Sequence, residues 1–218
     1  MKLCSGGLIF VIEFLINYLF NFKFLDMARD VKGKKVAIIT EHGFEEVELT
    51  SPMNALEEAG AIVSIISPQD GKVKAWNHDH WSIELPVDKH ISEANPEDYD
   101  MLLLPGGVLN PDKLRLNKEA VSFAQHFLEQ AKPLAAICHG PQTLIETGML
   151  DGRTMTSYWA IKTDLINAGV NWQDKEVVVD NGLVTSQGPE DLEAFNKKMI
   201  EELSEGPHAT TGQFTHSK

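Results

Sequence analysis

The stretch Leu134-Ala135-Ala136-Ile137-Cys138-His139-Gly140-Pro141 decides how this chain is expected to fold. Its four apolar residues are typical of a short buried strand, and Gly140-Pro141 begins a segment that favours a helix. Cys138 therefore lies at a strand-to-helix turn, where a nucleophile elbow places its reactive residue. We expect the helix N-terminus and the adjacent histidine to favour its thiolate. The alternative is a small buried apolar cysteine, which would have no need of the flanking His-Gly.

Apolar runs of the same kind recur along the chain and alternate with helical patterns. Buried strands are predicted at 36–40, 62–67 and 101–104. Helices are predicted at 45–59, with a bend or restart near Pro52, and at 118–130, 160–168 and 189–203. Hairpins are predicted within 71–87 and around Asn181-Gly182. This order predicts an α/β fold with a mostly parallel sheet, helices on both faces and a small hairpin excursion.

Three loops follow predicted strands and carry polar groups. They are residues 41–48, 106–112 and 138–140. In a parallel α/β sheet, ligands bind beyond the carboxyl ends of the strands, so these loops should converge. They would bring a thiol, histidines, carboxylates and glycine N–H groups to one edge of the sheet.

Composition limits the classes of partner. The 218 residues fit one domain, and a formal net charge of −13 argues against nucleic acid or an anionic membrane surface as the partner. The two cysteines, Cys4 and Cys138, offer no disulfide framework or zinc spacing, so we expect a cytoplasmic protein. His78 and His80 would share a strand face, but no further metal ligand has recognisable spacing. We therefore predict no metal and no cofactor.

The two ends of the chain differ from the predicted domain. Residues 7–25 are mostly apolar but are interrupted by Glu13, Asn17, Asn21 and Lys23, which makes a poor signal peptide and a poor membrane span. Translation is expected to start at Met27, and a membrane-associating extension is the alternative. The expected organisation is an extension at 1–32, one domain at 33–204 and a disordered tail at 205–218.

Three sequence motifs together resemble one family. They are Leu103-Leu104-Pro105-Gly106-Gly107, Ala136-Ile137-Cys138-His139-Gly140-Pro141-Gln142, and Glu176-Val177-Val178-Val179-Asp180 followed by Thr185-Ser186 and Pro189-Glu190-Asp191-Leu192. The chain from about 35 to 203 resembles the PfpI family, the intracellular peptidase and deglycase branch of the class I glutamine amidotransferase-like superfamily. The resemblance implies a flavodoxin-like three-layer sandwich.

The resemblance also implies roles for individual residues. Cys138 would be the nucleophile with His139 as its partner, and Glu48 would hydrogen-bond the sulfur. Asp112 matches an acid, often glutamate in the family, that a neighbouring subunit contributes to orient the histidine. Gly107 and His139 match the backbone N–H donors of an oxyanion hole. These assignments imply a homo-oligomer with the site at a subunit interface.

The residues alone leave some of these assignments open. Glu48 follows Glu45 and Glu46, and an acidic helix start is often only a solvated face. Adjacent side chains on a regular helix point about 100° apart, so Cys138 and His139 can meet only if the elbow is not helical.

Several aromatic and histidine side chains are candidates for the walls of the site. We expect His42, His78, Trp81 and Tyr158 to line the pocket. Trp76 and Trp81 would wall a pocket or pack against another subunit.

Three functions fit this set of residues. The first is a stress-protective enzyme acting on reactive carbonyls, glyoxalase III-like or a protein deglycase, with small aldehydes such as methylglyoxal or glycated proteins and peptides as partners. The second is an intracellular cysteine peptidase or amidase. The third is a cysteine redox sensor or stress chaperone. An amidotransferase is disfavoured because the chain contains no synthetase.

Overall fold

Seven strands form the central sheet of residues 31–209, the part of the chain that the computed structural model describes. Across the sheet they are β11 (Val177–Asp180), β12 (Leu183–Ser186), β8 (Leu134–Ile137), β7 (Met101–Leu104), β1 (Lys35–Ile39), β3 (Ile62–Ser67) and β6 (Lys89–His90). All neighbours pair in parallel except β11, which is antiparallel to β12. The predicted mostly parallel sheet is confirmed.

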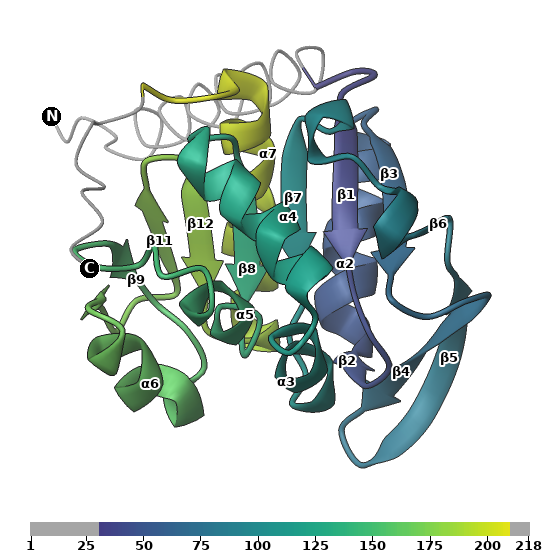
Figure 1. Cartoon of the computed structure of the whole chain (residues 1–218), viewed down its shortest axis with the longest axis horizontal. Helices are drawn as coiled ribbons and strands as arrows, with labels where there is room; N and C mark the ends of the chain where they lie inside the picture. The colour runs from purple at the N-terminus through teal and green to yellow at the C-terminus, as the bar shows by residue number, and fades with distance from the viewer. Residues whose placement is uncertain (1–30, 210–218) are drawn as a thin grey trace, which may run out of the picture.

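Helices cover both faces of this sheet, which completes the three-layer sandwich (Figure 1). They are α2 (Glu46–Glu58), α3 (Leu109–Leu114), α4 (Lys118–Glu129), α5 (Gln142–Ile145), α6 (Lys162–Asn167) and α7 (Leu192–Glu205). Short 3-10 turns lie at Ile91–Glu93, Pro96–Asp98, Trp159–Ile161 and Pro189–Asp191. In Figure 1 the arrowheads of the parallel strands point to the lower edge of the sheet, where α3, α5 and β2 (Phe44–Glu45) lie.

The alternation of side chains along each strand divides the interior into two cores. In β1, Ala37 and Ile39 pack with Phe127 of α4, whereas Val36 and Ile38 face the other side of the sheet. That second core contains Leu49 and Leu56 of α2 and Phe195 and Met199 of α7. The central strands are apolar throughout because both of their faces are covered.

The predicted hairpin at 71–87 is present and sits beside the sheet. Strands β4 (Lys72–Asn77) and β5 (His80–Pro86) are antiparallel, and β4 also pairs with β2. Two further short strands, β9 (Thr154–Met155) and β10 (Asn171–Trp172), form a separate pair. The hairpin lies near the lower edge of the sheet, beside β2 (Figure 1).

Two expectations about the helices need correction. Helix α2 is continuous through the buried Pro52, so the predicted restart is wrong, whereas the predicted bend stays a prediction. The last helix begins only at Leu192, because Pro189–Asp191 form a 3-10 turn before it. Asn181 and Gly182 have φ of 48° and 81°, as the predicted tight hairpin turn requires.

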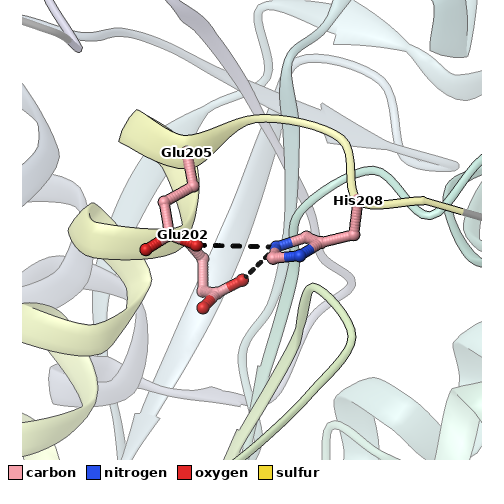
Figure 2. Close-up of side chains that lie close together, drawn as sticks. All are labelled: Glu202, Glu205 and His208. Carbon is pink, nitrogen blue, oxygen red and sulfur yellow. Dashed lines mark hydrogen bonds and ion pairs between the residues drawn. The ribbon is translucent and has the colours of Figure 1, made fainter.

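The packed domain extends beyond its predicted limits at both ends. Val31 is fully buried, so packing begins before residue 33. At the other end, the N–H of His208 donates to the Ala131 carbonyl (2.9 Å), and its Nε2 lies 2.7 Å from a carboxyl oxygen of Glu202 (Figure 2). The predicted disorder is therefore wrong for 205–209. Most of the predicted extension and residues 210–218 lie outside the described residues.

No helix within 31–209 is long and apolar enough to cross a membrane.

Candidate active site

The turn after β8 forms the predicted nucleophile elbow. Cys138 has φ of 59°, a strained value for a residue with a side chain, and its N–H donates to the Ser186 carbonyl (3.0 Å). A Cβ on Gly140 would lie 2.4 Å from the Leu104 carbonyl oxygen, so only glycine fits there. The sequence Cys-His-Gly thus turns the chain sharply between β8 and α5.

The turn brings the cysteine and histidine side chains together. Cys138 Sγ lies 3.2 Å from His139 Nδ1, because the left-handed backbone of Cys138 removes the helical separation of adjacent residues. The imidazole stacks on Tyr158, with ring centroids 4.8 Å apart and planes inclined by 29°. Tyr158 is itself held by its N–H, which donates to the Cys138 carbonyl (2.9 Å). Burial lowers the pKa of His139, so the ring is neutral at neutral pH and can accept a proton.

Glu48 is the third member of the group, placed by the first turn of α2. It is completely buried, unlike Glu45 and Glu46, so the interpretation as a solvated acidic face is wrong. Burial raises its pKa to about 8, although the Cys138 thiol and the N–H groups of Gly106 and Gly107 oppose the shift. Neither carboxyl oxygen has a hydrogen-bond partner of good geometry within 31–209. At neutral pH the group carries a proton it can give away.

The thiol is less acidic than the sequence predicts. Burial, and then the charge of Glu48 when it is ionised, raise the pKa of Cys138 above its ordinary value. The N–H groups of Gly107 and His139 point at the sulfur and lower the pKa, but not enough to compensate. The expected thiolate stabilisation is wrong because the thiol is buried and α5 has four residues, too few for a strong dipole. Formation of the thiolate would therefore require a base, and His139 Nδ1 is the ring nitrogen that lies 3.2 Å from the sulfur.

The same N–H groups lie beside the sulfur, where the resemblance implies an oxyanion hole. Gly107 follows β7 and has φ of 80°, and a Cβ on it would lie 2.4 Å from the Gly43 carbonyl oxygen. A Cβ on Gly106 would lie 2.3 Å from Glu48 Oε2 and 2.6 Å from the Cys138 Cβ. The Pro-Gly-Gly sequence thus lets the backbone approach the sulfur closely enough for N–H groups to face a reacting oxygen.

A cavity of about 760 Å³ opens onto the thiol. Of the predicted residues, its wall includes Glu48, His78, Gly107, Cys138, His139 and Tyr158. It also includes Trp76, which was expected to wall a pocket or pack against another subunit. Four further lining residues were not expected from the sequence, namely Val108, Leu109, Ala160 and Pro189. Val108 and Leu109 directly follow Gly106 and Gly107, and this proximity in the sequence is the feature that could have indicated them as cavity residues.

Two expected wall residues lie outside the cavity. His42 turns its Nδ1 to accept from the Lys74 N–H (3.0 Å), which ties the loop after β1 to the hairpin. Trp81 lies on the outer strand and packs edge-to-face on Trp76, with centroids 5.2 Å apart. Trp76 therefore takes the wall position predicted for Trp81.

Asp112 is exposed on α3 and does not line the cavity in one chain. His139 Nε2, for its part, has no hydrogen-bond partner within residues 31–209. One chain therefore leaves the outer nitrogen of the imidazole without the acid that the resemblance implies, and the role of Asp112 stays a prediction.

Potential metal ligands gather elsewhere. His78 and His80 are both exposed, and His80 is paired with Asp79 (2.8 Å). Among the described residues, Glu202, Glu205 and His208 have ligand-type atoms within 4.8 Å of one another (Figure 2). This group lies at the edge of the sheet opposite the thiol, because His208 bonds Ala131, just before β8, and Cys138 ends that strand. The contact between His208 and Glu202 holds the segment after α7 against that helix, and this structural role explains why the three side chains lie together.

Comparisons with known proteins agree with this geometry. YraA of Bacillus subtilis (strain 168), provisionally named a cysteine protease, is 46% identical over 168 residues, which cover 77% of this chain and 97% of that protein. A protein of Staphylococcus haemolyticus (strain JCSC1435) is 46% identical over 172 residues, covering 78% and 98% of the two chains.

Solved structures with the same fold include two that are informative. DJ-1beta of Drosophila melanogaster has a TM-score of 0.72 at 28% identity, covering 79% of this chain and 91% of that one. A two-domain protein of Anabaena variabilis, with DJ-1/ThiJ/PfpI-like and ferritin-like domains, has a TM-score of 0.73 at 38% identity. The match covers 78% of this chain but 48% of that longer protein. The model of the DJ-1/PfpI family matches residues 34–202. The turn at Cys138, the fold and these relatives agree with that match, and this chain belongs to the DJ-1/PfpI family.

Proposed function

We propose that this protein is a cysteine-dependent enzyme that converts reactive carbonyl compounds, with methylglyoxal and early glycation adducts of proteins as substrates, and that it protects the cytoplasm from them. One observation carries the proposal: the Cys138 thiol, the neutral His139 ring 3.2 Å away and the protonated carboxyl of Glu48 surround one point beside two N–H donors. Addition to an aldehyde needs these groups: a nucleophile, a base, an acid and an oxyanion site.

The first step is addition of sulfur to the aldehyde. His139 takes the thiol proton as Cys138 Sγ bonds to the aldehyde carbon of methylglyoxal, and the carbonyl π pair moves to oxygen. The N–H groups of Gly107 and His139 stabilise the oxyanion, which then takes the proton back from the imidazolium. The product is a hemithioacetal, and the enzyme groups return to their starting protonation.

The second step moves hydrogen from C1 to C2 of the bound substrate. His139 removes the C1 proton to give an enediolate, and the Glu48 carboxyl protonates C2. The proton of the C1 hydroxyl passes to the C2 oxygen, which leaves a lactoyl thioester on Cys138, a protonated His139 and an ionised Glu48. Water hydrolyses the thioester to lactic acid and the free thiol. The imidazolium of His139 returns its proton to Glu48, and the lactic acid releases its own proton to solvent as lactate. One water is consumed overall, and C1 is oxidised as C2 is reduced, so no external redox partner is needed.

Lactate formation tests the proposal. Wild type should convert methylglyoxal to lactate, and Cys138→Ala should lose at least about a thousandfold in rate, as expected when a nucleophile is removed. Cys4→Ala is the matched control and should retain the wild-type rate. Equal lactate production by wild type and Cys138→Ala would overturn the proposed function.

A second candidate is a cysteine peptidase or amidase. The provisional name of YraA, at 46% identity, favours it, and the same thiol and imidazole could attack an amide carbonyl. Hydrolysis of unfolded casein by wild type and not by Cys138→Ala would favour this candidate, whereas intact casein in both would exclude it.

We also propose that the working form is a homo-oligomer. His139 Nε2 lacks a partner within 31–209, and the exposed Asp112 lies on α3, whose Leu109 lines the cavity. An Asp112 carboxylate from a second subunit would accept a hydrogen bond from the Nε2–H group and fix the tautomer in which Nδ1 can act as the base.

A further inference from the structure

The buried amide of Asn110, at the start of α3, connects the oxyanion loop to the central sheet. Its side chain is completely buried and uses both ends. Nδ2 donates to the carbonyls of Pro105 (2.8 Å) and Gly106 (3.1 Å). Oδ1 accepts from the Glu41 N–H (2.7 Å) and the Thr40 hydroxyl (3.3 Å), just beyond the end of β1. The backbone partners leave one possible orientation of the amide, because an N–H must meet an oxygen and a carbonyl must meet an N–H.

The bond to Gly106 acts on the oxyanion hole through one rigid unit. The Gly106 carbonyl and the Gly107 N–H belong to the same peptide group, which is planar and trans, so they point in opposite directions. Holding the carbonyl on Asn110 therefore aims the N–H away from Asn110. That N–H is the one that points at the Cys138 sulfur.

This peptide needs to be held because glycine flanks it on both sides. Gly106 and Gly107 must lack a Cβ to let the backbone approach Glu48 and Gly43, as the contacts above show. The same lack of a Cβ permits wide rotation of the peptide plane. Besides Asn110, the Gly106 carbonyl accepts a hydrogen bond from the Glu45 N–H at 3.4 Å, a long distance for this kind of bond.

We propose that Asn110 is a positioning residue that fixes the Gly106–Gly107 peptide so that the Gly107 N–H faces the oxyanion formed at Cys138. The proposal deepens the proposed function and rests on carbonyl addition at Cys138. Asn110 contacts neither the sulfur nor the cavity. Its loss should weaken reactions that create an oxyanion and spare those that do not.

Two reactions of the Cys138 thiol can be compared, one that creates an oxyanion and one that does not. Benzaldehyde adds reversibly to a thiol to give a hemithioacetal, and it has no second carbonyl to allow turnover. Iodoacetamide alkylates a thiol by displacing iodide, without an oxyanion. The experiment compares three full-length proteins, wild type, Asn110→Asp and Asn110→Ser. 13C NMR of carbonyl-labelled benzaldehyde follows formation of the hemithioacetal, and a second assay measures the rate of Cys138 alkylation. Asn110→Asp keeps the acceptor oxygen and loses both donors, whereas Asn110→Ser retains one donor and remains available if the first variant does not fold.

We expect Asn110→Asp to lower the rate of benzaldehyde addition about ten- to a hundredfold, since an aligned donor stabilises the oxyanion formed during addition, and to change the rate of alkylation less than about threefold. Asn110→Ser should lie between it and wild type. Asn196→Asp is the matched control, because Asn196 donates to Ser51 between α7 and α2, and it should leave both reactions unchanged.

Two results would overturn the inference. Equal losses in addition and alkylation would mean that Asn110 only supports the elbow, and unchanged addition would mean that the peptide is held without it. A third result concerns wild type alone. If iodoacetamide alkylates its Cys138 but benzaldehyde forms no hemithioacetal with it, the proposed function is overturned, and the inference with it.

Discussion

At the scale of single residues, the site depends on a carboxyl group kept protonated by burial. Glu48 is fully buried between Cys138 and the glycines of the oxyanion loop, and its pKa of about 8 means that it donates rather than accepts a proton at neutral pH. Because the thiol also keeps its proton, the proposed reaction requires that proton to be transferred to His139. The resting site is therefore uncharged, which a buried position favours.

Glu48 should make the stability of the protein depend on pH. Its folded pKa of about 8 lies above the ordinary value of 4.5, so the folded state binds more protons than the unfolded state between these values. Stability should therefore fall as pH rises from about 5 to 8. Glu48→Gln should reduce the loss of unfolding free energy between pH 5 and pH 8.5 by about 2 to 4 kcal/mol. Urea unfolding of the variant and of wild type at these two pH values measures the difference.

Glu57→Gln, at an exposed position of the same helix, is the control and should keep the wild-type pH dependence. Equal slopes in Glu48→Gln and wild type would show that Glu48 is already ionised at neutral pH.

At the scale of elements, the elbow depends on close contact between β7 and the turn after β8. The missing side chain of Gly140 allows the Leu104 carbonyl to approach, although the φ of Gly140 lies outside the left-handed region. Gly140→Ala should thus cost about 2 to 4 kcal/mol in urea unfolding, because two backbone segments must separate.

Gly188→Ala provides the comparison, since a Cβ there would meet only the movable end of the Glu190 side chain. It should change stability by less than about 0.5 kcal/mol. A Gly140→Ala variant as stable as wild type would mean that the turn is adaptable.

The sequence reveals those elements whose signal is local. The runs 101–104 and 134–137 could be recognised as strands because burial on both faces requires continuous apolar residues, and Asn181-Gly182 specifies its own turn. Strand β2 could not be recognised, because its two residues are defined by pairing with β4. Helix α3 was also missed, since Asn110-Pro111 resembles a loop.

The residues of the site also divide into those indicated by local sequence and those that depend on packing of distant segments. Cys138 and Gly107 belong to recognisable motifs, whereas the burial of Glu48 depends on packing against distant segments. Trp76 and Trp81 are paired directly across the hairpin, and Trp76 lines the cavity because its strand, β4, is the one that pairs with β2. No local sequence pattern indicates that pairing.

At the scale of the whole molecule, we predict that two subunits share each site. Cys138→Ala and Asp112→Ala should each be inactive toward methylglyoxal, but subunit exchange between them should restore roughly a quarter of the wild-type sites in a random dimer. Those sites combine the cysteine of one subunit with the acid of the other. Glu119→Ala, at an exposed position of α4, should be fully active alone. Full activity of Asp112→Ala, or no recovery on mixing, would contradict the shared site.

The central claim is that Cys138 bonds covalently to a carbonyl carbon. The most direct measurement is 13C NMR of aldehyde-labelled methylglyoxal added to an equal concentration of protein. We expect a hemithioacetal resonance in wild type, followed by labelled lactate, and neither signal with Cys138→Ala. The same hemithioacetal and lactate signals in Cys138→Ala would contradict it.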